Sequence, residues 1–457
     1  MNLRDAYSNK WLGFFQVTLL YILQNINAYL VIPNYNLIKQ NLKVSDIYLG
    51  IMTGGYLFLN GLAALLWSYA SDVRGLKRKI LLASSYFSGG ILTLLASISP
   101  HPYLILLFWI LTGGSLGAII PLGFSIISDL FEREKRTSIY MLWYTLGGVG
   151  LAIGYAIAIF LGVNYGWRRP LFIGAFTLII IGVPLCFSLW EPPRGISEVE
   201  NIKPYRYSYP YKFRPQDIGL ILSNKSNIYV ALQGFFGTIP NGVLFTWSLQ
   251  FLIREVRVNE IGATIILGIA STGALGGLAL SYVTDKLYKK EVIYRPLVAA
   301  ICSFSEGILF AVFFSLPIKL NIYTDDVASA LHKILEAMIS NTLVLTAVLI
   351  FFIAMFFNSS VGPIRNSVLS DINLPEHRAT VLSAIVIMEL FSKAIGITIV
   401  GILSDVLNTL RYPMIAVMLI WVLSGIAWLK VANYYTMDAQ KIRDIIMDRM
   451  KYLETNE

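Results

Sequence analysis

Twelve apolar segments, each long enough to cross a lipid bilayer, divide this chain of 457 residues. A membrane-spanning helix needs about 20 predominantly apolar residues. Hydrocarbon offers the backbone no water to bond, so each span should be helical. The sequence therefore predicts an all-α membrane protein with twelve transmembrane helices. The expected spans are 11–33, 47–70, 79–99, 103–128, 137–163, 170–190, 227–253, 261–282, 295–316, 342–369, 380–406 and 412–430.

Composition excludes several other classes of protein. Hydrophobic residues make up 56% of the chain and charged residues 14%, whereas soluble domains are about 25% charged. Two cysteines and three dispersed histidines provide neither a disulfide framework nor a metal-ligand cluster. The sequence also lacks a Walker phosphate-binding loop and the H-E-x-x-H and G-x-S-x-G motifs. We therefore expect a protein that is not an enzyme and that holds no metal or cofactor.

Basic residues predict the orientation in the membrane. With the N-terminus inside the cell, the inner segments hold 25 Lys and Arg residues and the outer segments hold 9. Such a bias in short loops places the basic side in the cytoplasm. We therefore expect a multi-pass protein of the plasma membrane with both termini in the cytoplasm.

Two pairs of motifs indicate an internal repeat. The stretch 68–72 (SYASD) is similar to 281–285 (SYVTD), 213 residues later, and 125–129 (SIISD) is similar to 367–371 (SVLSD), 242 residues later. Each motif closes an apolar span, at corresponding depths in the two halves. The expected parts are a six-span bundle at 1–190, a cytoplasmic linker at 191–226, a second six-span bundle at 227–436 and an amphipathic cytoplasmic tail at 437–457.

The loop after span 2 resembles the signature of the major facilitator superfamily, G-x-L-A-D-R-x-G-R-K. Asp72 and Gly75 match it, and the basic run 77–79 follows. Within that superfamily, the stretches 166–168 (GWR) and 191–195 (EPPRG) are similar to motifs of the spinster-like transporters. The resemblance implies two pseudo-symmetric six-helix bundles and suggests a lipid-like substrate. The acids that these relatives carry in spans 1 and 4 are missing here, so their coupling mechanism does not transfer.

Four ionisable residues fall deep within predicted spans of the second half: Glu306, Arg365, Glu389 and Lys393. Such groups cost at least about 2.5–3.5 kcal/mol each to insert, so they are functional candidates. Uncharged residues occupy the corresponding positions of the first half, so the fold alone does not require the charges. Glu389 and Lys393 are one helical turn apart and can pair. An ion cluster that only positions helices is the alternative interpretation.

These charges suggest how a solute is bound and how its movement is driven. We expect Arg365 and Lys393 to bind an anionic or zwitterionic solute. If transport is proton-linked, Glu389 is the preferred proton carrier, and Glu306 is the second candidate. Protonation of Glu389 would free Lys393 to hold the anion.

Amide side chains extend the expected substrate site. By the resemblance, spans 1, 4, 7 and 10 line a central cavity, although each amide could instead bond a neighbouring helix. The expected amides are Asn25, Asn27, Gln233, Asn241 and Asn358.

The resemblance also implies a cytoplasmic gate. Asp72 would meet the positive end of a helix dipole and a basic residue such as Arg136 in one conformation, and release them in another. Asp285 and Arg378 would form the corresponding pair in the second half. Positive-inside anchoring accounts for part of the basic run. The expected gate residues are Asp72, Gly75, Arg78, Arg136, Asp285 and Arg378.

Together these features predict a secondary transporter that moves a small organic solute, anionic or amphiphilic, by alternating access of two bundles. Proton coupling stays open. So do a facilitative uniporter of a sugar or drug-like molecule and a receptor or scaffold that binds without transport. The expected partners are the solute and the bilayer. The aromatic and basic stretch 203–214 favours anionic lipid headgroups over nucleic acid, and we expect a monomer.

Overall fold

The computed structural model describes residues 10–72, 74–131, 133–192, 216–324 and 326–455. Within these ranges it contains twelve apolar helical stretches long enough to cross a membrane, which confirms the predicted number of spans. Their bounds are Lys10–Leu42, Asp46–Ser71, Arg78–Ile98, Pro102–Leu130, Leu142–Tyr165, Arg168–Ser188, Lys225–Val256, Glu260–Tyr288, Tyr294–Ser315, Thr342–Asp371, Ala384–Leu407 and Arg411–Asp448.

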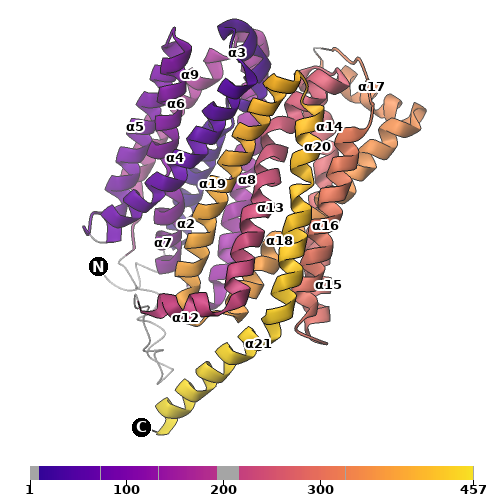
Figure 1. Cartoon of the computed structure of the whole chain (residues 1–457). Coiled ribbons are helices and arrows are strands. Elements are labelled where there is room, and N and C mark those ends of the chain that lie inside the picture. The colour runs from indigo at the N-terminus through magenta and orange to yellow at the C-terminus, as the bar shows by residue number, and fades with distance from the viewer. Residues whose placement is uncertain (1–9, 73, 132, 193–215, 325, 456–457) are drawn as a thin grey trace. The chain divides into compact units, whose positions relative to one another are not determined.

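The chain divides into two compact units, Met1–Pro210 and Tyr211–Glu457, whose helices are drawn in Figure 1. Unit 1 contains α2 (Lys10–Ala28), η1 (Ile32–Asn34), α3 (Tyr35–Leu42), α4 (Asp46–Asp72), α5 (Arg78–Ile98), α6 (Pro102–Leu116), α7 (Ile119–Leu130), α8 (Arg133–Tyr165), α9 (Arg168–Phe176), η2 (Thr177–Gly182) and α10 (Val183–Ser188). Unit 2 contains α12 (Asp217–Ser223), α13 (Lys225–Phe251), η4 (Leu252–Val256), α14 (Glu260–Ser271), η5 (Thr272–Gly276), α15 (Gly277–Tyr288), α16 (Tyr294–Ser315), α17 (Val327–Ser340), α18 (Thr342–Asp371), α19 (Pro375–Leu407), α20 (Arg411–Met418) and α21 (Ile420–Thr455).

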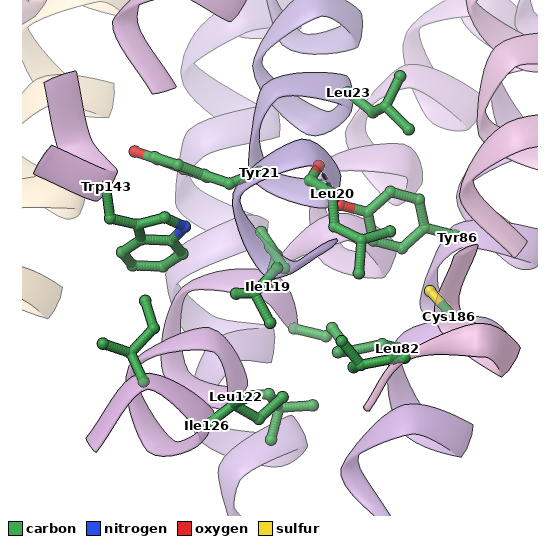
Figure 2. Close-up of a cluster of buried hydrophobic side chains, with 14 of the residues drawn as sticks. Leu20, Tyr21, Leu23, Leu82, Tyr86, Ile119, Leu122, Ile126, Trp143 and Cys186 are labelled. Atoms are coloured by element: carbon green, nitrogen blue, oxygen red, sulfur yellow. Dashed lines mark hydrogen bonds between the residues drawn. The ribbon is translucent and has the colours of Figure 1, made fainter. Parts of the chain in front are cut away.

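The core of unit 1 is apolar and aromatic, as Figure 2 shows. Leu20 of α2 is fully buried, and its carbonyl accepts a hydrogen bond of 2.5 Å from the hydroxyl of Tyr86 in α5. Trp143 of α8 packs on Tyr21 of α2, with ring centroids 4.6 Å apart. Large aromatic side chains bury much apolar area and pack in tilted pairs of this kind. These contacts therefore hold α5 and α8 against α2.

In unit 2, α13 packs against α19 and α21, and α16 packs against α18 and α21. Glycine permits the close approach of α13 and α19. A Cβ atom added to Gly242 of α13 would lie 3.0 Å from the Cα of Lys393 in α19. Small residues at helix contacts allow backbones to come this near in a membrane, so a larger side chain at Gly242 would push the two helices apart.

The two units repeat one capping device. In unit 1, Nη1 of Arg168 at the start of α9 donates to the carbonyl of Ser99, 2.7 Å away, just beyond the end of α5. In unit 2, Nη1 of Arg411 at the start of α20 donates to the carbonyl of Leu316, 2.6 Å away, just beyond the end of α16. Carbonyls at a helix C-terminus lack partners within the helix, so each arginine joins the beginning of one span to the end of another.

The last helix, α21, runs without interruption from Ile420 to Thr455. The second part of the final span and most of the expected tail therefore form one helix, whereas the first part of that span is α20. The carboxylate of Asp438 in α21 accepts a hydrogen bond of 2.9 Å from the backbone N–H of Ser226, in the first turn of α13. Most of the expected linker, residues 193–215, lies outside the described residues.

Candidate functional site

An ion pair joins two membrane-spanning helices of unit 2. Nη1 of Arg365 in α18 contacts Oε1 of Glu389 in α19, and the two side chains are only 14% and 11% exposed. Glu389 also faces α13, where a Cβ on Gly234 would lie 3.5 Å from its Oε1. The carboxylate therefore lies at van der Waals distance from α13.

This arrangement corrects the partner expected for Glu389. The sequence predicted that Glu389 could pair with Lys393 on its own helix, but the structure pairs it with Arg365 on α18. The physical reason is that a guanidinium carries several donors on a long stem and forms strong charge-assisted bonds to carboxylates. The acid therefore links two helices.

Lys393 lies beside α13 and does not take part in the ion pair of Glu389. Its Cβ lies 2.9 Å from the ideal Cβ position of Gly242, so the base of its side chain lies against α13. Among the residues that the structure describes, no carboxylate forms an ion pair with Lys393. A partly buried ammonium within a span is costly without a counter-charge, so this position is chemically suited to receive an anion.

Glu306 belongs to a second polar cluster inside unit 2. This residue of α16 is 1% exposed, and the side-chain amide of Asn358 in α18 donates to its Oε2 at 2.8 Å. On the same helix as Glu306, Ser303 accepts from the hydroxyl of Ser424 in α21 at 3.5 Å. Gln233 of α13 in turn donates to Ser424 at 3.2 Å. The predicted residues Gln233 and Asn358 therefore bond neighbouring helices.

The other predicted amides lie apart from these charges. In unit 1, Asn25 donates to the carbonyl of Tyr21 on its own helix at 3.0 Å, and Asn27 donates to the hydroxyl of Thr93 in α5 at 3.4 Å. In unit 2, Asn241 of α13 is partly exposed. Within the described part of the chain, the side chain of Asn241 forms no hydrogen bond, so this amide is available to a solute.

A charged cluster closes one end of unit 1. Arg78 is fully buried and donates to Asp129 at 2.5 Å and to Glu191 at 3.0 Å. These contacts join the start of α5 to the end of α7 and to the segment after α10. Gly75 forms the preceding turn with a φ of +66°, in the left-handed region. The expected role of Arg78 beside Asp72 is not tested, because the side chains of Asp72 and Arg136 lie outside the described residues.

Unit 2 contains a matching cluster. Arg295, at the start of α16, donates to Asp371 at 2.6 Å and to Asp285 at 3.0 Å. The hydroxyl of Tyr435 in α21 also bonds Asp371. The structure thus gives Asp285 the partner Arg295, and its expected pairing with Arg378 stays a prediction. The side chain of Arg378 is outside the described part of the chain.

Sequence reasoning missed the central residues of these two clusters. Asp129 and Asp371 were seen only as members of a repeated motif, although they are related by the 242-residue offset. Each of them pairs with the arginine at the start of the preceding span, Arg78 or Arg295. Arg78 and Arg295 are 217 residues apart, near the 213-residue offset of the other motif, and Arg168 and Arg411 are 243 residues apart. A search for cations that recur near either offset could have found them.

These features define a membrane protein of two six-span units with charged residues at the helix ends and inside unit 2. Among the described residues, no group of three or more His, Cys, Asp or Glu could hold a metal ion. The sequence profile of the Major Facilitator Superfamily matches residues 17–388. The chain belongs to this family of membrane transport proteins.

Several curated relatives are similar over part of the sequence. A probable hexose phosphate transport protein of Chlamydia muridarum is 22% identical, over 51% of this chain and 54% of its own length. The sphingosine-1-phosphate transporter SPNS2 of Danio rerio is 23% identical, over 61% of this chain and 57% of its own length. The membrane sensor protein UhpC of Escherichia coli is 22% identical, over 50% of this chain and 54% of its own length. The chain thus spans little more than half the length of these relatives, and the resemblance to the spinster-like group is confirmed.

Solved structures share the fold over nearly the whole chain. A bacterial homolog of the human lysosomal transporter Spinster, in an inward-facing and unoccupied conformation, superposes with a TM-score of 0.69. It is 16% identical and covers 94% of this chain and 98% of its own. A D-xylose-proton symporter gives a TM-score of 0.63 at 15% identity, covering 94% and 99%. These likenesses establish the major facilitator fold.

Proposed function

We propose that this protein is a secondary transporter of an organic anion and that Arg365, Glu389 and Lys393 form the anion-binding part of its site. One observation carries the proposal. Lys393 is a cation within a membrane-spanning helix, and within the described residues it has no acidic partner. An uncompensated charge at such a position is costly, and a bound anion would offset that cost.

The Arg365–Glu389 pair provides a switch beside this cation. A solute anion and Glu389 compete for the same guanidinium, because both are oxyanions that accept from its N–H groups. Entry of the solute displaces Glu389, and departure of the solute restores the pair. The internal carboxylate therefore offsets the charge of Arg365 while the site is empty.

A phosphate-bearing solute fits two neighbouring cations better than a neutral solute does. Arginine and lysine are the usual phosphate ligands in proteins. Two relatives support this class, since one is described as a hexose phosphate transport protein and another as a sphingosine-1-phosphate transporter. Both solutes share a phosphomonoester and differ in its apolar or polar body.

Proton coupling would act through Glu389. Protonation removes the charge that holds Arg365 and so favours binding of the anion. Deprotonation restores the competitor and favours release. Solute and proton would therefore move in the same direction. Glu306 remains the second candidate carrier, because it is buried and bonds the neutral Asn358.

The test is ligand-dependent stabilisation of the purified protein. A solute that binds the folded state raises its melting temperature by mass action. We expect glucose 6-phosphate or sphingosine-1-phosphate to raise the midpoint of wild type, and glucose or sphingosine to have no comparable effect. Lys393→Gln should abolish the shift, whereas Lys333→Gln in exposed α17 should retain it. Equal shifts in wild type and Lys393→Gln would exclude Lys393 from the site.

A signal-transducing receptor is the second candidate function. The observation that favours it is the similarity to the sensor protein UhpC. Such a protein would share the stabilisation by an anion but would not move it. Liposomes that contain the protein would then bind the phosphate-bearing solute without accumulating it.

A further inference from the structure

The helix α17 (Val327–Ser340) has no counterpart between α5 and α6, the corresponding place in unit 1. In unit 1 only three residues, 99–101, separate α5 from α6, whereas eleven residues, α17 and Asn341 separate α16 from α18 at the corresponding place in unit 2. The fold therefore does not require this helix. Figure 1 shows α17 at the end of unit 2 opposite α12, beside α14.

One face of α17 is firmly attached to unit 2. Ala330 and Ile334 are 0% and 1% exposed, and α17 packs against α14 and α18. The carboxylate of Asp326 accepts from the backbone N–H of Ser329 at 2.8 Å and so caps the first turn. Asn341 then accepts from the N–H of Leu343 at 3.0 Å and caps α18. The helix is thus fixed at both ends.

A second face of α17 is apolar and exposed. Val327, Leu331, Leu335 and Ile339 are 60%, 40%, 44% and 88% exposed. We call these four residues the apolar ridge. With about 100° of rotation per residue, the ridge covers an arc of roughly 120°. It adjoins the attached face on one side and the polar residues on the other. Those polar residues are Ser329, His332, Lys333, Glu336 and Ser340.

We propose that the apolar ridge inserts into the surface of the bilayer and that α17 lies in the plane of the membrane interface. A helix with one apolar and one polar face adopts this position, with its apolar side buried about 5–10 Å into the headgroup and acyl boundary. The next span, α18, also has exposed apolar side chains near its start. Leu343, Leu345 and Leu349, in the first turns of the next span, are 38%, 38% and 48% exposed.

Lipid is favoured over a protein partner by the exposed leucines of the adjoining span α18 and by the charge pattern of α17. Lys333 and Glu336 lie on the polar arc, away from the ridge, where water or headgroups can solvate them. The exposed side chains of His332 and Glu336, at 82% and 69%, agree with a solvated face. At the membrane interface the apolar ridge would thus face the acyl chains and the polar arc would face water and headgroups.

The experiment compares two labelled positions in the full-length protein, reconstituted into phosphatidylcholine and phosphatidylglycerol vesicles. An environment-sensitive fluorophore is attached at Ile339→Cys in the ridge or at Lys333→Cys on the polar arc. The native cysteines Cys186 and Cys302 are buried, with exposed fractions of 0% and 1%. Both are replaced by alanine, so that only the introduced cysteine carries the label. Each label is then quenched with a lipid nitroxide near the headgroup or with aqueous iodide.

We expect the lipid nitroxide to quench the label at position 339 at least about twofold more than the label at 333, and iodide to show the reverse order, as burial of only the apolar face requires. Equal lipid quenching at both positions would contradict the proposal. Protection of position 339 from both quenchers would also overturn it, because the ridge would then be covered by protein. Cross-linking through Ile339→Cys would identify a second copy as that cover.

Discussion

Arg365 and Glu389 place opposite charges on two neighbouring helices, and each charge depends on the other. Breaking a buried pair by removing one partner typically costs about 3–5 kcal/mol, because the remaining charge stays desolvated. We expect Arg365→Gln to lower the free energy of unfolding substantially, and the Arg365→Gln/Glu389→Gln double variant to recover much of that loss. Thermal unfolding in detergent measures both effects.

A strictly additive result would contradict the pairing. If the double variant lost the sum of the two single losses, Arg365 and Glu389 would not interact. Lys393→Gln provides the comparison within α19. Because Lys393 has no acidic partner among the described residues, its loss should not lower stability in this way.

Backbone geometry predicts opposite effects on stability for alanine substitutions at Gly75 and Gly148. Gly75 has a φ of +66°, and a Cβ there would meet no atom within 4 Å. Gly75→Ala should therefore cost about 1–2 kcal/mol through the left-handed backbone rather than through a clash. Gly148 in α8 also has open space at its Cβ position, but it is helical, so Gly148→Ala should be neutral or stabilising. Equal melting temperatures of the two variants would show that the turn at Gly75 relaxes freely.

At the scale of residues, the sequence identified unusual charges but not their partners. A charged residue within a long apolar run is visible in the sequence itself. Four such residues could therefore be recognised: Glu306, Arg365, Glu389 and Lys393. Their pairing depends on which helix faces which. Gly242 lets α19 approach α13, and the contact between α18 and α19 brings Arg365 to Glu389. No spacing rule within one helix contains this information.

At the scale of elements, the arginine caps should stabilise both units. Arg168 donates to the carbonyls of Ser97 and Ser99, whereas the adjacent Arg169 is exposed. Hydrogen bonds from charged groups contribute about 1.5–3 kcal/mol each. We expect Arg168→Gln to lower the melting temperature and Arg169→Gln to leave it nearly unchanged. Thermal unfolding of both variants and of Arg411→Gln measures the effect. A similar small change for all three would exclude a capping role.

The positions of the membrane spans could be predicted from the sequence, but the points at which the helices end could not. Long apolar runs define the spans, because a bilayer requires about 20 apolar residues in each. The same criterion does not locate ends inside polar sequence. The continuation of the last span through α21 to Thr455 depends on contacts such as the one between Asp438 and Ser226. The attached position of α17 likewise depends on its packing against α14 and α18.

For the whole molecule, we propose that both termini and the linker lie in the cytoplasm, because the basic residues concentrate on that side. Single cysteines at Ser208→Cys and Ser329→Cys, in a background without Cys186 and Cys302, should react oppositely with an impermeant reagent on intact cells. Position 329 should be labelled and position 208 protected. Labelling of position 208 from outside would reverse the proposed orientation.

Transport of a phosphate-bearing solute is the central proposal, and counterflow measures it most directly. Proteoliposomes are loaded with unlabelled glucose 6-phosphate, or sphingosine-1-phosphate in a second series, and labelled solute is added outside. We predict that wild type accumulates label with one of them. Lys393→Gln should slow uptake about tenfold or more, because a charged hydrogen bond contributes about 1.5–3 kcal/mol, and Lys333→Gln should match wild type. Binding of both solutes without uptake by wild type, or unchanged uptake by Lys393→Gln, would contradict the account.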